Sequence, residues 1–472
     1  MTMNSTGFMG EDFILSTPIA RRLYHDFAAE APIVDVHNHL PPDEIADDYV
    51  WPTITDAWLG GDHYKWRAMR LAGVPEHLVS GPADPWERFE AWAATVPRMI
   101  RNPLYVWTHL ELKRAFGIDL PLSPATAREI WDEANRQLPD LGARAMLRHF
   151  DVQLVATTDD PGSLLEDHAR LATMNDAGLR MVPTFRPDAG HALLGEPERW
   201  NSWVDTLVAA GDATAITDLA SLLDALASSY RRMAAAGCRA SDHGLAALPD
   251  RPRDPDHADR VVRAAREGQA ADDHDREIVL LEIVALAARL AAADDAVLQI
   301  HLGPLRNVSP RLMDAVGRDA GADVMGDAGQ ALGLARFLGD LERADSLPRT
   351  VLYNLNPADN ALLITMAGAF ARPGVPGLVQ WGPPWWFNDH EGGMRRHLDD
   401  LSQIGQLGGF IGMLTDSRSM LSMTRHELFR RILCDVIGRD VEAGTVPADI
   451  DALGQLVRAV SVDNAREFFG FA

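Results

Sequence analysis

The chain has 472 residues, of which 47% are apolar and 24% are charged, an ordinary composition for a globular protein. Its net charge of −24 argues against a nucleic-acid partner, because phosphate backbones bind basic surfaces, although a few local arginines can still hold a small anion. The two cysteines lack paired spacing, residues 1–12 do not read as a signal peptide, and no apolar run could span a bilayer, so we expect a cytoplasmic protein without a membrane partner.

Short apolar runs alternate with helical segments along the chain, as is typical of a buried parallel sheet. Eight such runs favour closure into a (β/α)₈ barrel, and we predict an α/β fold of this kind. We expect residues 1–41 to contain an N-terminal segment and the first strand, 42–150 to form a helical insertion, and 151–472 to complete the barrel. The predicted strands are 33–39, 152–157, 179–185, 238–243, 297–302, 350–355, 377–381 and 410–415.

The first predicted strand ends in two histidines, His37 and His39. Side chains two residues apart in a strand share a face, so both imidazoles would point to the same side. Imidazole is the commonest ligand of transition metals, and the pair therefore indicates a metal site more strongly than two unrelated polar residues. Asp35 lies on the same face and could orient one of the rings.

The last predicted strand ends at Asp416, followed by Arg418. An aspartate there could cap the next helix, but a closed barrel would place it beside the first strand and its histidines. Asp416 would then serve as a metal ligand or a proton acceptor. Arg418 could bind a carboxylate or lower the pKa of a neighbouring phenol.

A run of unusual chemistry, residues 60–67, lies within the helical insertion. It could simply begin an amphipathic helix, with Trp66 in the core. For His63 and Tyr64 we favour a loop or helix start that reaches the barrel mouth. Tyr64 could act there as an acid or base if a cation stabilised its phenolate.

Further candidates follow the third, fifth and seventh strands. Arg186 and Arg306 are candidate clamps for an anion, with structural salt bridges as the alternative for each. His301 could be a metal ligand or a substrate contact, and Trp386 could line the cavity. Together these residues suit a small anionic polyol, and they fit metal-assisted hydrolysis as well as proton transfer beside a carbonyl.

Several long motifs resemble those of uronate isomerase (glucuronate isomerase), a divergent family of the amidohydrolase superfamily. They are His37-Asn38-His39, the block from Trp58 to Arg67, the segment from Asn102 to Leu112, and the segment from Gly412 to Ser419. Arg425-His426-Glu427 and the segment from Phe429 to Leu433 are similar too. The similarity runs from about Ile14 to the C-terminus. It implies a distorted (β/α)₈ barrel of the metal-dependent hydrolase type with a helical insertion after strand one.

The resemblance also implies an activity: interconversion of D-glucuronate with D-fructuronate and of D-galacturonate with D-tagaturonate. It implies one divalent ion, usually Zn²⁺, on His37, His39 and Asp416. Tyr64 paired with Arg418 would transfer a proton through a cis-enediol while Asp416 moves protons between oxygens. Arg186 and Arg306 would bind the uronate carboxylate, and His63, His301 and Trp386 would contact hydroxyls and the carbon chain.

The main alternative is a metal-dependent hydrolase of a small carboxylated amide or lactone. Hydrolases of the superfamily normally have a strand-six histidine, where this chain has Asn354, and often a carboxylated lysine on strand four, where residues 238–243 offer none. Both differences favour the isomerase. We also expect a homo-oligomer, but we assign no interface to it.

Overall fold

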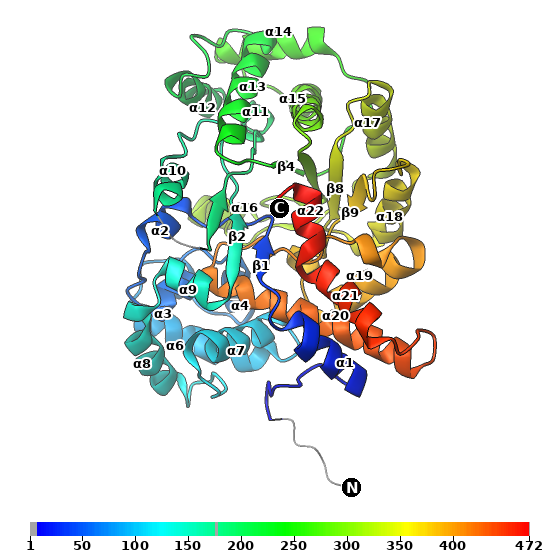
Figure 1. Cartoon of the computed structure of the whole chain (residues 1–472). Helices are drawn as coiled ribbons and strands as arrows, with labels where there is room; N and C mark the ends of the chain where they lie inside the picture. The colour runs from blue at the N-terminus through cyan, green and yellow to red at the C-terminus, as the bar shows by residue number, and fades with distance from the viewer. Residues whose placement is uncertain (1–6, 175–177, 472) are drawn as a thin grey trace.

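In the described part of the chain, seven strands form two parallel sheets in the middle of the molecule (Figure 1). The computed structural model describes residues 7–174 and 178–471. The sheets have the orders β1-β2-β3 and β4-β5-β8-β9, and an isolated bridge between Phe185 and Ser241 joins the segment after β3 to β4. The strands are β1 (Ile33–Asp35), β2 (Val152–Ala156), β3 (Arg180–Val182), β4 (Ala240–Leu245), β5 (Val297–Leu302), β8 (Arg349–Asn354) and β9 (Val379–Trp381).

The segment 410–417 returns the chain to the end of β1. Asp416 donates its N–H to the His37 carbonyl at 3.2 Å, and His39 donates its N–H to the Ser417 carbonyl at 2.9 Å. The prediction of a strand over 410–415 is nevertheless wrong, because none is formed in this described segment. Gly412 (φ 77°) and Asp416 (φ 46°) leave the extended region and interrupt any regular ladder. The first and last barrel segments therefore meet through loops.

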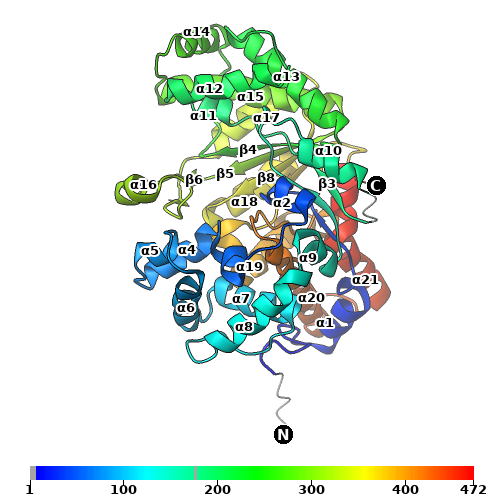
Figure 2. The ribbon, with the colours of Figure 1, turned by 90° about the vertical axis from the view of Figure 1, so that its left-hand side faces the viewer.

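Residues 42–149, between β1 and β2, carry a group of helices, most of which lie on one side of the strands (Figure 2). Their buried aromatic side chains, including Trp58, Trp92 and Trp107, join the same apolar core as the strands β1, β2 and β5. The division of the chain into domains stays a prediction. The helices are α2 (Pro42–Asp47), α3 (Ile54–Leu59), α4 (His63–Leu71), α5 (Glu76–Val79), α6 (Pro85–Thr95), α7 (Pro103–Phe116), α8 (Ala127–Gln137) and α9 (Ala143–His149).

A second group of helices covers the opposite side of the strands (Figure 2). It packs around its own apolar cluster, which includes Trp200 and Leu226. Much of this group precedes β4, and α14 and α15 lie between β4 and β5. The helices are α10 (Glu166–Thr173), α11 (Ala189–Ala192), α12 (Pro197–Ala209), α13 (Leu219–Ala235), α14 (Pro255–Arg266) and α15 (Asp273–Ala293).

An excursion after β5 was not predicted. The short antiparallel strands β6 (Pro304–Leu305) and β7 (Val324–Met325) enclose α16 (Pro310–Val316), which projects from the body of the protein (Figure 2). The other helices are α1 (Pro18–Leu23), α17 (Ala331–Arg343), α18 (Asn360–Ala369), α19 (Glu391–Ile404), α20 (Thr424–Glu442), α21 (Ile450–Arg458) and α22 (Asn464–Phe469).

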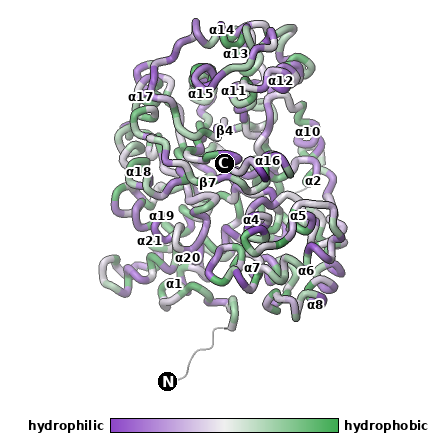
Figure 3. Tube along the Cα trace, turned by 180° about the vertical axis from the view of Figure 1, so that it is seen from behind, coloured by the Kyte–Doolittle hydropathy of each residue, from purple (hydrophilic) through white to green (hydrophobic). Residues whose placement is uncertain are grey.

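The alternation of parallel strands with helices confirms the predicted α/β class. Hydrophilic and hydrophobic residues alternate along the outer helices, as expected for elements with one face in the core (Figure 3). Within the described residues, no helix is both long enough and apolar enough to cross a bilayer. The expectation for residues 1–12 falls partly on residues 1–6, which lie outside the described part of the chain.

Candidate active site

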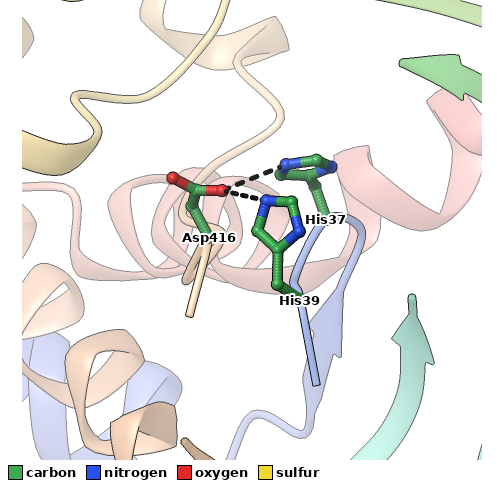
Figure 4. Close-up of side chains that lie close together, drawn as sticks. All are labelled: His37, His39 and Asp416. Atoms are coloured by element: carbon green, nitrogen blue, oxygen red, sulfur yellow. Dashed lines mark hydrogen bonds and ion pairs between the residues drawn. The ribbon is translucent and has the colours of Figure 1, made fainter. Parts of the chain in front are cut away.

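His37, His39 and Asp416 lie together where the chain leaves β1 (Figure 4). The Nε2 atoms of His37 and His39 are 3.2 and 3.1 Å from the same carboxylate oxygen of Asp416. Burial opposes ionisation of this carboxyl group, but the two imidazoles outweigh it and hold the Asp416 pKa well below its usual range. Asp416 is therefore an anion that faces two imidazole nitrogens.

Asp35 holds the backbone next to Asp416. Its carboxylate accepts hydrogen bonds from the Thr415 N–H at 2.9 Å and from the Thr415 hydroxyl at 2.6 Å. Asp35 thus orients the segment that carries Asp416, whereas we expected it to orient an imidazole of the first strand. The left-handed conformation of Asp416 is uncommon for a residue other than glycine, and this support from Asp35 helps to hold it.

The cluster fits a divalent metal ion. One ligand atom each from His37, His39 and Asp416 lies within 4.8 Å of the others. Two imidazoles and a carboxylate are a common ligand set for zinc in sites that keep a position open for substrate. A second group, His37, Asp242 and His301, has the same spacing, but the guanidinium of Arg186 lies 2.7 Å from Asp242 and already neutralises that carboxylate.

A cavity of about 300 Å³ opens beside the cluster. It is lined by most of the residues that we singled out from the sequence: His37, His39, His63, Arg186, His301, Arg306, Trp386, Asp416 and Arg418. Tyr64 instead lines an adjoining hollow of about 380 Å³, which shares His39, His63, Asp416 and Arg418 with the first. The structure thus brings residues from both ends of the chain, the insertion and three strand ends to one place.

The candidate anion clamps differ in their surroundings. Arg186 is held by Asp242 at 2.7 Å and by Asp188 at 3.3 Å, so its guanidinium is fixed at the cavity wall. Arg306 is 42% exposed, pairs with Asp323 at 2.8 Å and lies 5.2 Å from the Trp386 ring. Each arginine therefore makes the salt bridge that was our alternative, while it also lines the cavity.

Asp242 is a site residue that we missed. It ends up buried on β4, where one oxygen contacts Nδ1 of His301 at 2.7 Å and the other contacts Arg186 at 2.7 Å. Burial opposes its ionisation, but Arg186 and the nearby histidines hold its pKa well below the usual range. Its position within the predicted strand 238–243 was a usable signal, because a buried charge needs a partner.

Tyr64 lies in the first turn of α4, which begins after Asp62. The Asp62 side chain caps this helix by accepting the N–H groups of Tyr64 and Lys65. The cation beside the Tyr64 ring is Arg425, 5.5 Å from the ring centroid. We expected Arg418 to lower the Tyr64 pKa, but burial and the charge of Asp416 raise it well above its usual value, against the opposing effect of Arg425.

Arg418 lies at the rim of the two hollows, with its side chain 40% exposed and 3.9 Å from Asp319. Its place on the wall shared by the cavity and the Tyr64 hollow allows it to contact a ligand in either.

Asn354 does not line the cavity. Its side chain accepts a hydrogen bond from the Trp381 indole at 2.6 Å and donates one to the Asn360 side chain at 2.9 Å.

Comparison with known proteins identifies the relatives of this chain. A family model described as glucuronate isomerase matches residues 5–469. The chain belongs to this family. Its sequence is 44% identical over 465 residues to the uronate isomerase of Pectobacterium atrosepticum, a match that covers 98% of each chain. The resemblance that we inferred from the sequence motifs is therefore confirmed.

Solved structures agree with this assignment. Uronate isomerase from Thermotoga maritima, which has a crystal structure, is 34% identical in sequence to this chain. The two structures have a TM-score of 0.91 over 98% of this chain and 100% of that one. Glucuronate isomerase from Caulobacter crescentus, 23% identical, shares the fold with a TM-score of 0.89 over 99% of this chain and 97% of that one. The family assignment makes the protein an aldose–ketose isomerase of uronates, and it confirms the isomerase over the hydrolase alternative.

Proposed function

We propose that the protein interconverts D-glucuronate with D-fructuronate, and D-galacturonate with D-tagaturonate, by proton transfer on the open-chain sugar. The observation that carries this proposal is the convergence of His37, His39 and Asp416 beside a cavity that arginines line in an otherwise acidic chain. Such a site suits a small anion with several hydroxyl groups, because the guanidinium groups on the cavity wall can donate hydrogen bonds to its carboxylate.

The reaction needs two proton movements and no oxidant. The proton on C2 of the aldose moves to C1, and the proton on O2 moves to O1, with a cis-enediol between the two forms. We propose that Tyr64 transfers the proton between C2 and C1. Asp416, whose carboxylate is ionised and lines both hollows, would transfer the proton between O2 and O1.

Tyr64 rests as a neutral phenol, because its pKa is raised. It must therefore lose its own proton before it can accept the one on C2. Positive charge favours that loss, and Arg418 on the shared wall would supply it when substrate displaces water from the rim.

Substrate selection falls to the rest of the cavity wall. Arg186 and Arg306 would bind the uronate carboxylate, which favours uronates over neutral aldoses because a neutral sugar lacks the charge that strengthens hydrogen bonds from the guanidinium groups. His63, His301 and Trp386 line the same cavity and would contact the hydroxyl groups and the carbon chain.

His37, His39 and Asp416 would hold one divalent ion, and we propose Zn²⁺ because the ligand set is two imidazole nitrogens and a carboxylate oxygen. When bound, this ion supplies a Lewis acid for an oxygen of the sugar.

A cytoplasmic location and a homo-oligomer stay predictions, which cell fractionation and analytical ultracentrifugation would test.

The first experiment is proton NMR of D-glucuronate with the purified protein in D₂O, with and without added Zn²⁺. Ketose that carries deuterium at C1 would support transfer through an enediol with an exchanging base. Ketose without deuterium would point to hydride transfer or a shielded proton and would count against the assigned route. An unchanged spectrum with both glucuronate and galacturonate would refute the proposal.

A further inference from the structure

Arg425 is a fully buried cation beneath the candidate active site. It is the second residue of α20, and only 1% of its side chain is exposed. A buried charge is costly, and a cation in the first turn of a helix also opposes the helix dipole. Helix stability therefore gives no reason for an arginine here, and its contacts must supply one.

Its hydrogen bonds join two segments of the site. Its Nη1 group donates to the carbonyl oxygen of Thr415 at 3.0 Å and to the carboxylate of Asp389 at 3.2 Å. Thr415 precedes Asp416, and Asp389 follows the short helix η5 (Trp386–Asn388). The Arg425 guanidinium thus binds both the segment that carries Asp416 and the segment that carries Trp386, which lines the cavity.

Its ring contacts join a third segment. The guanidinium carbon lies 3.8 Å from the centroid of Trp107 and 5.5 Å from that of Tyr64. Both aromatic residues belong to the helical insertion, on α7 and α4. Trp107 therefore supports the guanidinium from one side, while Tyr64 lies at a distance where the positive charge attracts the ring and stabilises a phenolate.

Several charged or titratable groups face Tyr64, from α4 and from the segments packed against it: Asp62, His63, Asp389, Asp416, Arg418 and Arg425. The two arginines differ in their exposure. The Arg418 side chain is 40% exposed, so water and salt screen its charge. Arg425 is buried, so its charge is screened much less.

We propose that Arg425 is a positioning residue for the isomerisation, which fixes Tyr64 relative to Asp416 and keeps a positive charge beside the Tyr64 ring. This inference rests on the proposed role of Tyr64. It differs from a purely structural role, because a structural residue would affect folding without acting through Tyr64.

The test compares Arg425→Met, Tyr64→Phe and the double variant with the wild-type holoenzyme, using D-glucuronate. A displaced catalytic group typically costs about 10²-fold, so we expect Arg425→Met to lower kcat by about 10²-fold while KM changes less than about threefold. In the Tyr64→Phe background the same substitution should lower kcat by less than about threefold, because its effect is transmitted through Tyr64.

Arg431→Met is a matched control on the same helix. Arg431 is 2% exposed, contacts the rings of Phe13 and Tyr24, and pairs with Glu427, all away from the cavity. We expect its loss to lower thermal stability and to leave kcat within about twofold at a temperature where the variant is folded. If Arg425→Met does not fold, Arg425→Lys keeps the charge, and its kcat should fall about tenfold at unchanged KM.

The possible outcomes distinguish the proposed role of Arg425 from the proposed role of Tyr64. Full activity in Tyr64→Phe would overturn the role of Tyr64 itself. A large loss in Tyr64→Phe together with wild-type kcat in Arg425→Met or Arg425→Lys would overturn only the role of Arg425. Equal losses from Arg425→Met in both backgrounds would also overturn it, because they would show that Arg425 does not act through Tyr64.

Discussion

Asp242 offers a sharp test of the electrostatics of this site, because one buried carboxylate neutralises Arg186 and orients His301. Asp242→Asn keeps the shape and an oxygen that can accept from Nδ1 of His301, but it removes the negative charge. Breaking a buried ion pair by removing one partner costs about 3–5 kcal/mol. Arg186 is 22% exposed and retains Asp188 at 3.3 Å, so we expect a smaller loss, about 2–3 kcal/mol.

The assay is urea unfolding followed by tryptophan fluorescence. The transition midpoint should fall at an unchanged slope, because the surface exposed on unfolding stays the same. Asp132→Asn is the control: Asp132 is 64% exposed and pairs with Arg128 at 3.6 Å, and we expect less than about 0.5 kcal/mol from its loss. An unchanged midpoint in Asp242→Asn would refute the view that Asp242 is the charged counter-ion of Arg186.

The same variant makes a prediction about pH. The folded-state pKa of Asp242 lies below its value in the unfolded chain, so its charge stabilises the protein above pH of about 4 and this contribution is lost as the pH falls further. The difference in unfolding free energy between wild type and Asp242→Asn should therefore narrow in acid. A difference that stays constant down to pH 3 would show that charge is not its source.

Three further predictions concern the reaction and the metal. Tyr64→Phe should lower kcat/KM for D-glucuronate by about 10²–10⁴-fold at unchanged thermal stability, measured by NMR of the ketose. Arg186→Met should raise KM for D-glucuronate by about 10–100-fold, the value of one charge-assisted hydrogen bond to the carboxylate, and an unchanged KM would exclude it as a clamp. Burial opposes protonation of His37, but Asp242 and Asp416 outweigh it and raise the His37 pKa, so Zn²⁺ must displace a proton and should bind more tightly as the pH rises through 7, measured by chelator competition. Affinity independent of pH between 6 and 8 would count against His37 as a ligand.

The sequence predicted what depends on local pattern and on distinctive motifs. Apolar runs at β2, β5 and β8 identified strands within one residue of their ends, because buried parallel strands are almost continuously apolar. The segment 410–415 has the same pattern but forms no strand, because Gly412 and Asp416 adopt positive φ values. Backbone conformation of that kind depends on tertiary contacts such as that of Asp35 with Thr415, and an apolar pattern does not encode them.

The candidate site shows the same division. Histidines, arginines and an aspartate that follow apolar strands could be assigned to the barrel mouth because strand ends converge there. Arg425 gave no such signal, since it lies in a helix, far along the chain from Tyr64. Which cation meets Tyr64 is decided by the packing of α20 against α7, and residue spacing carries no information about that contact.

The arrangement of the site explains why it draws on segments so far apart. The carboxylate that faces His37 and His39 is held in place through backbone contacts of Asp416 and through Asp35, which bonds Thr415. Tyr64 comes from an insertion whose core is continuous with that of the strands, and its ring packs against that core. A proton moved between adjacent carbons demands that kind of fixed geometry, because an acid–base group must lie within hydrogen-bond reach of the atoms it serves. Arg425, one buried side chain, contacts both the segment that carries Asp416, through Thr415, and the ring of Tyr64, and it therefore links the two groups that we propose for the proton transfers.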